Sequence, residues 1–323
     1  MLSLVTGGAG FLGSHLVNSL IDDGDDVLII DNLSTGHVRN LERAVSSGRA
    51  TFMYADVSQS PEQLGALVAG ATTGRLARIF HLASPASPKA YGENPWETLR
   101  VNAIGTMSLV ELALAHHARF FFASTSEIYG DPLVHPQPEG YFGNVDPVGP
   151  RSCYDEGKRF GEAVVATAFA SRGLDARIAR FFNCYGPAMD EAEGRLIPEL
   201  FNAVYKKMPL PIHGTGLQTR SMTYVADAVD SLRALMDMPQ RGLQPLNIGN
   251  DRELTIEEIA RAVARVAEVA FEPVYLPGRP GDPQRRRPDL TIARSYGLVP
   301  TTPLEKGLEA TYRWFCGERM AFA

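Results

Sequence analysis

Thr6-Gly7-Gly8-Ala9-Gly10-Phe11-Leu12-Gly13 follows the apolar run Leu2–Thr6 directly and opens a stretch with helical periodicity. In a turn between a strand and a helix, glycines at this spacing permit the tight turn, the approach of a pyrophosphate and the packing of helix on strand. The N-terminus of the helix offers free N–H groups and a positive dipole to phosphates. The next apolar run, Val27–Asp31, ends in an acid that can hydrogen-bond ribose hydroxyls. These features predict a dinucleotide site on the first strand of an α/β fold.

The acid at the end of the second run also bears on the choice of dinucleotide. The carboxylate of Asp31 would repel the 2′-phosphate of NADP, and the neighbouring Asn32 carries no compensating charge. Asp56 and Val57 follow the third apolar run, at a height suited to the adenine. We therefore expect NAD rather than NADP.

Short apolar runs alternate with amphipathic stretches through the first half of the chain, which favours a doubly wound parallel sheet. The strands are expected at Leu2–Thr6, Val27–Asp31, Thr51–Tyr54, Arg78–Ala83, Phe120–Ser124 and Ala176–Phe181, and the helices include Gly13–Asp22, Thr98–His116 and Tyr154–Arg172. Such strands are apolar nearly throughout because both faces are buried.

After Phe181 the pattern changes, and glycine, proline and arginine become frequent. We expect loops at Gly186–Gly194, Pro209–Gly216 and Pro277–Pro288, and helices at Arg195–Lys207, Val225–Met238, Thr255–Val269 and Leu304–Phe315. Pro245–Gly249 is expected to rejoin the main sheet as a strand. The predicted division is therefore a dinucleotide-binding domain of residues 1–181 plus 223–250, and a smaller, discontinuous substrate-binding lobe of residues 182–222 plus 251–323.

Composition excludes several classes of partner and site. The 323 residues carry a net charge of −6, which argues against a nucleic acid or an anionic membrane as partner. Cys153, Cys184 and Cys316 form no CxxC pair, so we expect neither a metal site nor a disulfide framework. No leader precedes the first strand and no apolar run is long enough to span a bilayer, so we expect a cytoplasmic protein.

Two polar tracts carry the predicted chemistry. Ser124-Thr125-Ser126-Glu127 follows the apolar run Phe120–Ala123, and ligands of open α/β sheets bind at such strand ends. Tyr154 and Lys158 are four residues apart and share one face of a helix. An ammonium beside a phenol lowers the pKa of the tyrosine, which makes it a usable acid–base group for a sugar hydroxyl. The two tracts together predict hydride transfer at an alcohol carbon.

Together these tracts resemble the extended short-chain dehydrogenase/reductase family of nucleotide-sugar enzymes, and within it the UDP-glucuronate decarboxylases, which make UDP-xylose. The fold of that family is the doubly wound Rossmann sheet. The resemblance is carried by Val5–Gly13, Asp31-Asn32, Thr35-Gly36, His81–Pro88, Ala123–Pro132, His135-Pro136-Gln137, Gly149–Arg159, Gln218-Thr219-Arg220 and Asp282–Asp289.

The resemblance implies that the sugar C4 is oxidised by tightly bound NAD, that the 4-keto acid loses CO2, and that the ketone is then reduced again. It implies that Tyr154, assisted by Lys158 and Thr125, moves the proton at O4, and that Glu127 and Arg286 orient the carboxylate. The expected contacts of the cofactor are Gly7, Gly10, Phe11, Leu12, Asp31, Asn32, Thr35, Asp56, Val57, Leu82, Ala83, Tyr154 and Lys158.

The same resemblance implies a substrate site and an assembly. A UDP-sugar such as UDP-glucuronate brings two phosphates, which arginine forks bind well. The expected substrate contacts are Ser87, Tyr91, Ser126, Asn183, Arg195, Arg220 and Arg279. Members of the family commonly form homodimers through two helices per subunit, here within Thr98–His116 and Tyr154–Arg172.

Three alternatives remain open at this stage. Related 4,6-dehydratases carry an aspartate where this chain has Ser126, and that aspartate protonates the departing C6 hydroxyl. Related 4-epimerases usually lack the carboxylate of Glu127. A catalytically silent, NAD-binding regulatory protein would have no need of Thr125, Glu127, Tyr154 and Lys158 together.

Overall fold

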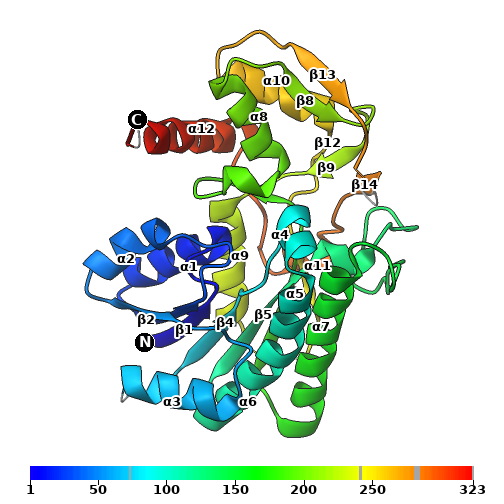
Figure 1. The fold of residues 1–323 in the computed structure, drawn as a ribbon. Helices are drawn as coiled ribbons and strands as arrows, with labels where there is room; N and C mark the ends of the chain where they lie inside the picture. Colours follow the sequence, from blue (N-terminus) through cyan, green and yellow to red (C-terminus); the bar gives the residue numbers. More distant parts are fainter. Residues whose placement is uncertain (73, 240–241, 280–283, 322–323) are drawn as a thin grey trace.

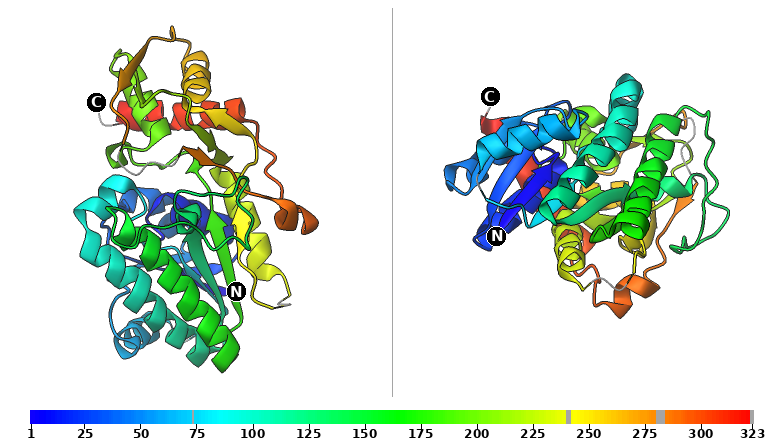
Figure 2. Two further views of the ribbon diagram at one scale, coloured as in Figure 1. Left: turned by 90° about the vertical axis from the view of Figure 1, so that its right-hand side faces the viewer. Right: turned by 90° about the horizontal axis from the view of Figure 1, so that it is seen from below.

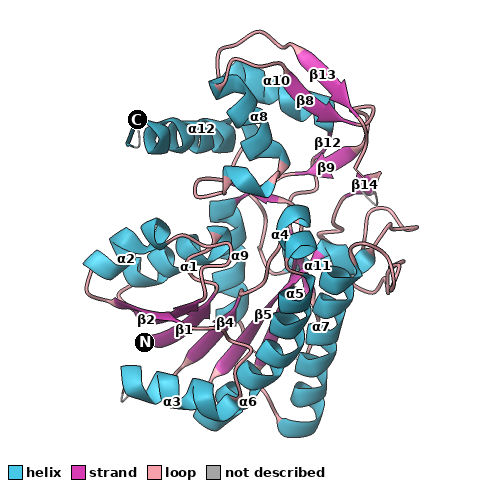
Figure 3. Ribbon diagram, in the orientation of Figure 1, coloured by secondary structure: helices cyan, strands magenta, loops and turns pink. Residues whose placement is uncertain are grey.

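The computed structural model describes residues 1–72, 74–239, 242–279 and 284–321, and its centre is a parallel sheet of seven strands (Figures 1 and 3). The strand order is β11-β6-β5-β4-β1-β2-β3. The strands are β1 (Leu2–Thr6), β2 (Asp26–Asp31), β3 (Ala50–Tyr54), β4 (Arg78–His81), β5 (Arg119–Thr125), β6 (Ala176–Phe181) and β11 (Leu246–Ile248). The predicted doubly wound α/β fold is therefore confirmed, and the predicted return of 245–249 to the main sheet is correct.

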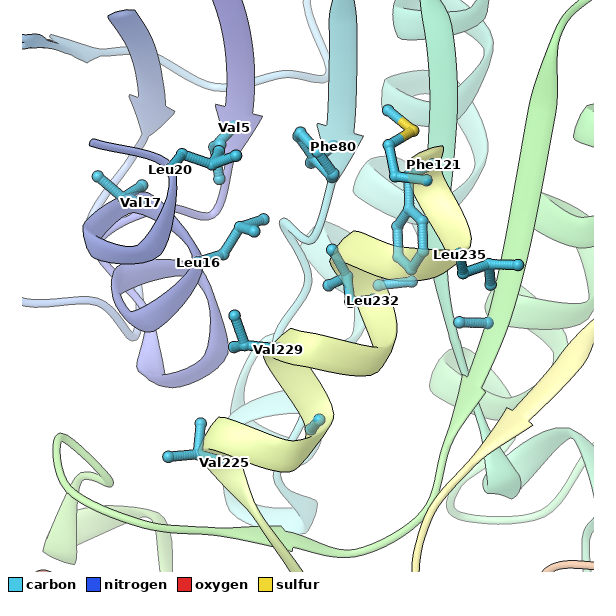
Figure 4. Packing of buried hydrophobic residues seen from close by; sticks show 14 of the residues in the cluster. Val5, Leu16, Val17, Leu20, Phe80, Phe121, Val225, Val229, Leu232 and Leu235 are labelled. Atoms are coloured by element: carbon cyan, nitrogen blue, oxygen red, sulfur yellow. The ribbon is translucent and has the colours of Figure 1, made fainter. Parts of the chain in front are cut away.

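Helices cover both faces of this sheet (Figure 2). One face carries α1 (Phe11–Asp22), α2 (Glu42–Ser46), α9 (Val225–Asp237) and α11 (Thr291–Ser295), and the other carries α3 (Pro61–Ala71), α6 (Thr106–His116) and α7 (Ser152–Arg172). Successive residues of a strand point to opposite faces, so Phe121 packs with α9 (Figure 4) whereas Phe120 and Phe122 pack with α6 and α7. Each face thus has its own apolar core.

A second lobe with a separate apolar core lies beyond the carboxyl ends of the strands (Figure 1). Its helices are α8 (Leu196–Tyr205), α10 (Ile256–Val266) and α12 (Leu304–Ala321), and its strand groups are β8 (Leu210–His213) with β13 (Pro273–Leu276), β9 (Thr219–Ser221) with β12 (Glu253–Thr255) and β14 (Arg285–Arg286), and β7 (Cys184–Tyr185) with β10 (Thr223–Tyr224). The prediction of plain loops at Pro209–Gly216 and Pro277–Pro288 is wrong, because β8 and β14 lie within them. Asp282 and Pro283 of the second segment lie outside the described residues.

The predicted helix Thr98–His116 is present and contains a π-helical turn. It consists of α5 (Pro95–Arg100), a π-helical turn at Val101–Gly105 and then α6, and it is preceded by α4 (Pro88–Glu93). Within the turn, Asn102 donates hydrogen bonds to Ser84 Oγ (3.0 Å) and Thr98 O (2.9 Å). π-Turns are common at functional sites, and here the turn places Val101 on the wall of the cavity described below. Short 3₁₀ turns occur at Val38–Leu41, Ser126–Tyr129 and Glu191–Glu193.

Candidate active site

The glycine-rich turn sits where β1 runs into α1. Helix α1 begins after Gly10, and among the described residues no side chain caps its first turn. A Cβ atom at Gly13 would lie 2.1 Å from Gly7 O, so only glycine allows the helix to pack this closely on the turn. The N–H groups of the uncapped turn face a cavity lined by Gly7, Gly10, Phe11 and Leu12. This arrangement fits the pyrophosphate of a dinucleotide.

Asp31 lies at the far wall of the same cavity, at the carboxyl end of β2. Its Oδ2 accepts a hydrogen bond from Ala9 N (2.9 Å) and its Oδ1 from Leu33 N (2.8 Å), which fixes the plane of the carboxyl group. Burial raises the pKa of Asp31, and the two backbone N–H groups lower it in part. Each carboxyl oxygen keeps a further lone pair for a ligand hydroxyl, so the group is suited to bind a ribose.

The cavity collects every residue that the sequence assigned to the cofactor. Asn32, Thr35, Asp56 and Val57 line the end near Asp31, and Leu82 and Ala83 line the middle beside the glycine turn. Tyr154 and Lys158 close the opposite end. The residues therefore fit an extended dinucleotide that runs from β3 to the end of β5.

Helix α7 brings Tyr154 and Lys158 to the end of β5. The helix can approach the sheet closely because Gly161 faces Phe122, where a Cβ atom would lie 2.3 Å from the ring. Lys158 Nζ donates a hydrogen bond to Ala123 O (2.8 Å) and lies 5.9 Å from the centre of the Tyr154 ring. Thr125, the last residue of β5, hydrogen-bonds the Tyr154 side chain. The structure thus unites the three residues predicted to act at the sugar O4.

The predicted lowering of the Tyr154 pKa by Lys158 is wrong for this structure. Burial raises the pKa of Tyr154 to about 12, and the groups that lower it in part are Thr125, through its hydrogen bond, and Arg195, through its charge. Burial also lowers the pKa of Lys158 to about 7. The spacing correctly placed both groups on one face, but desolvation by burial is the largest influence on both pKa values.

A buried cluster of charges lies next to the tyrosine. Arg286, carried by β14 of the second lobe, donates two hydrogen bonds to the Glu127 carboxylate (2.6 and 2.9 Å). Arg151 forms a second ion pair with Glu127. Burial alone would raise the pKa of Glu127, but the charges of Arg286 and Arg151 outweigh burial and lower it. Glu127 is therefore a carboxylate held between two guanidinium groups.

Neighbouring polar groups complete the floor of the site. Ser126 is buried and lines the cavity beside Glu127. Ser124 donates a hydrogen bond to Glu162 (2.5 Å), which also accepts from Arg180, so this serine faces the interior of the protein as well as the cavity.

A second cavity adjoins the first at Glu127, Asn183, Arg195 and Arg286 and extends into the second lobe. It contains Tyr91, Arg220 and Arg279, as predicted for substrate contacts. Asn183 Nδ2 and Tyr91 Oη are buried and find no hydrogen-bond partner among the described residues, which leaves them available to a ligand.

The carboxylates around this cavity occupy some of its arginines. Arg195 pairs with Glu193 (2.9 Å), and Arg279 pairs with Glu199 (2.6 Å). Ser87 lines neither cavity. It is the N-cap of α4, where its Oγ accepts a hydrogen bond from Ala90 N (3.1 Å), and a serine directly before a proline is a typical signal for that role.

Sequence reasoning missed Arg151. Its guanidinium pairs with Glu127 and lies 6.0 Å from the centre of the Tyr91 ring, so it touches both the charge cluster and the second cavity. The only signal in the sequence was its place directly before the tract that ends in Tyr154 and Lys158.

The chain matches a known protein family over most of its length. The family described as "NAD dependent epimerase/dehydratase family" matches residues 3–249. The chain belongs to this family. It is 41% identical to UDP-glucuronic acid decarboxylase 1 of Xenopus tropicalis over 313 residues, which cover 97% of this chain and 71% of that protein.

Solved structures of the family share its fold. The UDP-glucose 4-epimerase of Thermotoga maritima, solved with UDP-glucose, superimposes with a TM-score of 0.89 at 30% identity, covering 99% of this chain and 100% of that one. A dTDP-glucose 4,6-dehydratase of Streptomyces venezuelae with bound NAD gives a TM-score of 0.87 at 26% identity, covering 99% of this chain and 98% of that one.

Proposed function

We propose that this protein is a UDP-glucuronate decarboxylase that forms UDP-xylose and CO2. The observation that carries the proposal is the Glu127–Arg286 pair, buried where the cofactor cavity meets the second cavity. A guanidinium at this junction can bind the sugar carboxylate while the C4 hydroxyl faces Tyr154. The similarity to curated UDP-glucuronic acid decarboxylases over nearly the whole chain supports the same assignment.

The first half of the reaction prepares the carboxylate to leave. Bound NAD supplies a hydride acceptor, and later a hydride donor, at the sugar C4. Tyr154 accepts the proton from O4, and its hydrogen bond to Thr125 together with the charge of Arg195 favours the phenolate that this step requires. Oxidation at C4 turns the substrate into a β-keto acid.

The second half breaks the C5–C6 bond. The electron pair of that bond moves toward the C4 ketone as CO2 departs, which leaves an enolate. Protonation at C5 restores the ketone, and Tyr154 returns a proton to O4 when the ketone is reduced. Arg286 and Arg151 hold the reacting carboxylate beside Glu127, and Ser126 offers a hydroxyl in place of the acid that a dehydration would need.

Asp31 and the arginines of the second cavity bear on the specificity for cofactor and substrate. The Asp31 carboxylate favours NAD over NADP by charge. We assign UDP as the nucleotide, with Arg195, Arg220, Arg279 and Asn183 as the candidate contacts of its phosphates and sugar. Residues 1–181 plus 223–250 would hold the cofactor, and residues 182–222 plus 251–323 would hold the nucleotide sugar, with two exceptions to the boundaries: α11 packs on the main sheet and β10 pairs with β7 of the second lobe.

We further propose that the protein is a cytoplasmic homodimer. The adjoining helices α5, α6 and α7 expose Trp96, Met107 and Phe160, and the π-turn between α5 and α6 exposes Ile104, an apolar face that suits a homodimer. The free cysteines suit the reducing cytoplasm that we propose as the location. We propose neither a nucleic acid nor a membrane as partner. Among the described residues, no helix is both long and apolar enough to cross a bilayer.

One assay tests the proposed activity. Purified protein is incubated with UDP-glucuronate labelled with ¹⁴C at the carboxyl carbon, and released ¹⁴CO2 is counted while NMR follows the sugar. We expect equal amounts of CO2 and UDP-xylose. Epimerised UDP-galacturonate without CO2 would make the protein a 4-epimerase. Turnover of a nucleotide hexose to a 4-keto-6-deoxy sugar, with UDP-glucuronate untouched, would make it a dehydratase. Inertness toward both substrates, with NAD bound, would favour a regulatory protein.

A further inference from the structure

Arg286 lies on β14, which pairs with β9 of the second lobe, and the residues directly after β14 are hydrogen-bonded to Gln137 of the first lobe. Gln137 donates its backbone N–H to Arg287 O (2.9 Å), and its side-chain Oε1 accepts from Arg287 N (2.9 Å). Its carbonyl oxygen accepts from Asp289 N (2.9 Å). Gln137 is fully buried. Three hydrogen bonds with Gln137 therefore fix the position of the segment directly after Arg286.

Gln137 is itself held by the main sheet. Asn247 of β11 donates its Nδ2 to Gln137 O (2.9 Å) and to Asp289 O (3.1 Å), so one amide joins both segments. Asn247 Oδ1 accepts from Tyr129 Oη (2.8 Å). Asn247 is fully buried, and Tyr129 almost so. Buried amides with every polar atom satisfied fix the geometry around them more firmly than surface ones.

The same hydrogen-bond network also reaches the segment that carries Glu127, the ion-pair partner of Arg286. Tyr129 ends the 3₁₀ turn Ser126–Tyr129 that contains Glu127. Arg180 donates to Tyr129 Oη (3.0 Å) and forms an ion pair with Glu162 (2.7 Å), and Glu162 accepts from Ser124 at the end of β5. One chain of buried hydrogen bonds thus anchors the segment of Glu127 at one end and the segment of Arg286 at the other.

The energetics of the charge pair make this anchoring important. A buried ion pair is favourable only when its geometry is good, and a misplacement of about 1 Å in an active site can cost about 100-fold in rate. We propose that Gln137 is a positioning residue for the loss of CO2, because it sets the place of Arg286 opposite Glu127. The role rests on the proposed function, and it gives the His135-Pro136-Gln137 tract a purpose that the catalytic groups do not explain.

The variant that tests the proposal is Gln137→Met. Methionine has a similar size but cannot accept the hydrogen bond from Arg287 N, while the backbone hydrogen bonds of residue 137 are kept. Gln137→Glu retains an oxygen acceptor for Arg287 N but, like methionine, gives up the hydrogen bond from Nε2 to Val134 O (2.8 Å), so the difference between the two variants isolates the acceptor and makes Gln137→Glu the rescue variant. Ser108→Ala, on α6, removes a partly buried hydrogen bond to Gln59 O (2.7 Å) and is the control for loss of such a bond elsewhere.

The measurement is a single turnover of NAD-loaded protein with labelled UDP-glucuronate, in which absorbance at 340 nm reports oxidation at C4 and ¹⁴CO2 reports bond cleavage. For Gln137→Met we expect oxidation within about twofold of the unmodified protein and CO2 release slowed by about 10- to 100-fold. We expect Gln137→Glu to recover most of the CO2 rate, and Ser108→Ala to change neither rate. Because unfolded molecules contribute to neither signal, the ratio of the two rates is independent of the folded fraction.

Two results would overturn the positioning role. One is an unchanged ratio of CO2 release to oxidation in Gln137→Met, and the other is an equal loss of CO2 release in Gln137→Met and Gln137→Glu. Failure of the proposed function looks different, because the unmodified protein itself would then release no CO2.

Discussion

Glu127 forms ion pairs with both Arg286 and Arg151. Replacing Glu127 should therefore destabilise the fold more than replacing one of the two arginines. The side chain of Glu127 is 14% exposed, those of Arg286 and Arg151 are 6% and 16% exposed, and solvent therefore screens these pairs weakly. Glu127→Gln keeps the shape but leaves two arginines facing one another. Arg286→Met, in contrast, leaves Glu127 paired with Arg151.

The expected costs follow from this difference. Loss of one partner of a buried ion pair costs about 3–5 kcal/mol, which is our expectation for Glu127→Gln. Loss of hydrogen bonds to a charged group that keeps another partner costs about 1.5–3 kcal/mol, which we expect for Arg286→Met. At about 2 °C per kcal/mol, the melting temperatures should fall by about 6–10 °C and about 3–6 °C respectively.

The assays are thermal unfolding at pH 7, and urea unfolding at pH 7 and below about pH 4.5. The pKa of Glu127 lies below its ordinary value of 4.5, because the arginine charges outweigh burial. A carboxyl group with a lowered pKa stabilises the fold above its unfolded pKa, and that contribution is lost as the pH falls through the folded value. The stability gap between the unmodified protein and Glu127→Gln should therefore shrink below about pH 4.5.

A matched control comes from an exposed pair. Glu111 pairs with Arg172 on the surface, so Glu111→Gln should cost less than about 1 kcal/mol. The reasoning is refuted if Arg286→Met destabilises the protein as much as Glu127→Gln does. In activity, Glu127→Gln should slow CO2 release more than oxidation at C4, and the opposite order would contradict its role.

Four further outcomes are expected. Tyr154→Phe should slow oxidation at C4 by about 100-fold or more, measured as NADH formation, and a rate near that of the unmodified protein would exclude Tyr154 as the base. Lys158→Met should also lose oxidation, yet raise the melting temperature of the NAD-free protein. Burial lowers the pKa of Lys158 to about 7, so below pH 7 the folded protein must bury a charged ammonium. The increase in melting temperature should therefore be greatest below pH 7, and it should become smaller toward pH 10, where the lysine is neutral in the folded protein. An increase that grows with pH would contradict the lowered pKa of Lys158. Gly13→Ala should purify without NAD, as judged by the absorbance of a perchloric acid extract, because its Cβ atom would lie 2.1 Å from a backbone oxygen, whereas Gly65→Ala, with open space at its Cβ position, should retain NAD. Met107→Glu should convert the proposed dimer into a monomer in light scattering, and an unchanged mass would place the interface elsewhere.

The main sheet was predictable because strands buried on both faces appear as nearly continuous apolar runs. Each of the six early strands lies within about two residues of its expected bounds. The strands of the second lobe were harder, since β9 and β14 are short and pair with segments far away in sequence. The π-helical turn at Val101–Gly105, where Asn102 contacts Ser84, was also hidden, because such long-range contacts form only in the folded chain.

The residues of the candidate site were likewise predictable from the sequence only in part. Thr125, Glu127, Tyr154 and Lys158 could be found because each follows a strand end or a helical spacing that the sequence displays. Their protonation could not be predicted, because the pKa of Tyr154 depends on burial and not on spacing. Long-range partners such as Asn247 and Gln137, 110 positions apart, leave no local signal.

The location of Arg286 on a strand of the second lobe has an evolutionary consequence. The groups that move hydride and proton, Thr125, Tyr154 and Lys158, all belong to the main sheet and the helix packed on it. The group proposed to select a carboxylate arrives separately, on the two-residue strand β14, and the residues directly after that strand are hydrogen-bonded to Gln137. Substitutions in β14 and the residues after it can therefore change which product forms from the 4-keto sugar, while the residues that oxidise C4 stay the same. A lineage on this scaffold can diversify its products while inheriting its redox chemistry intact.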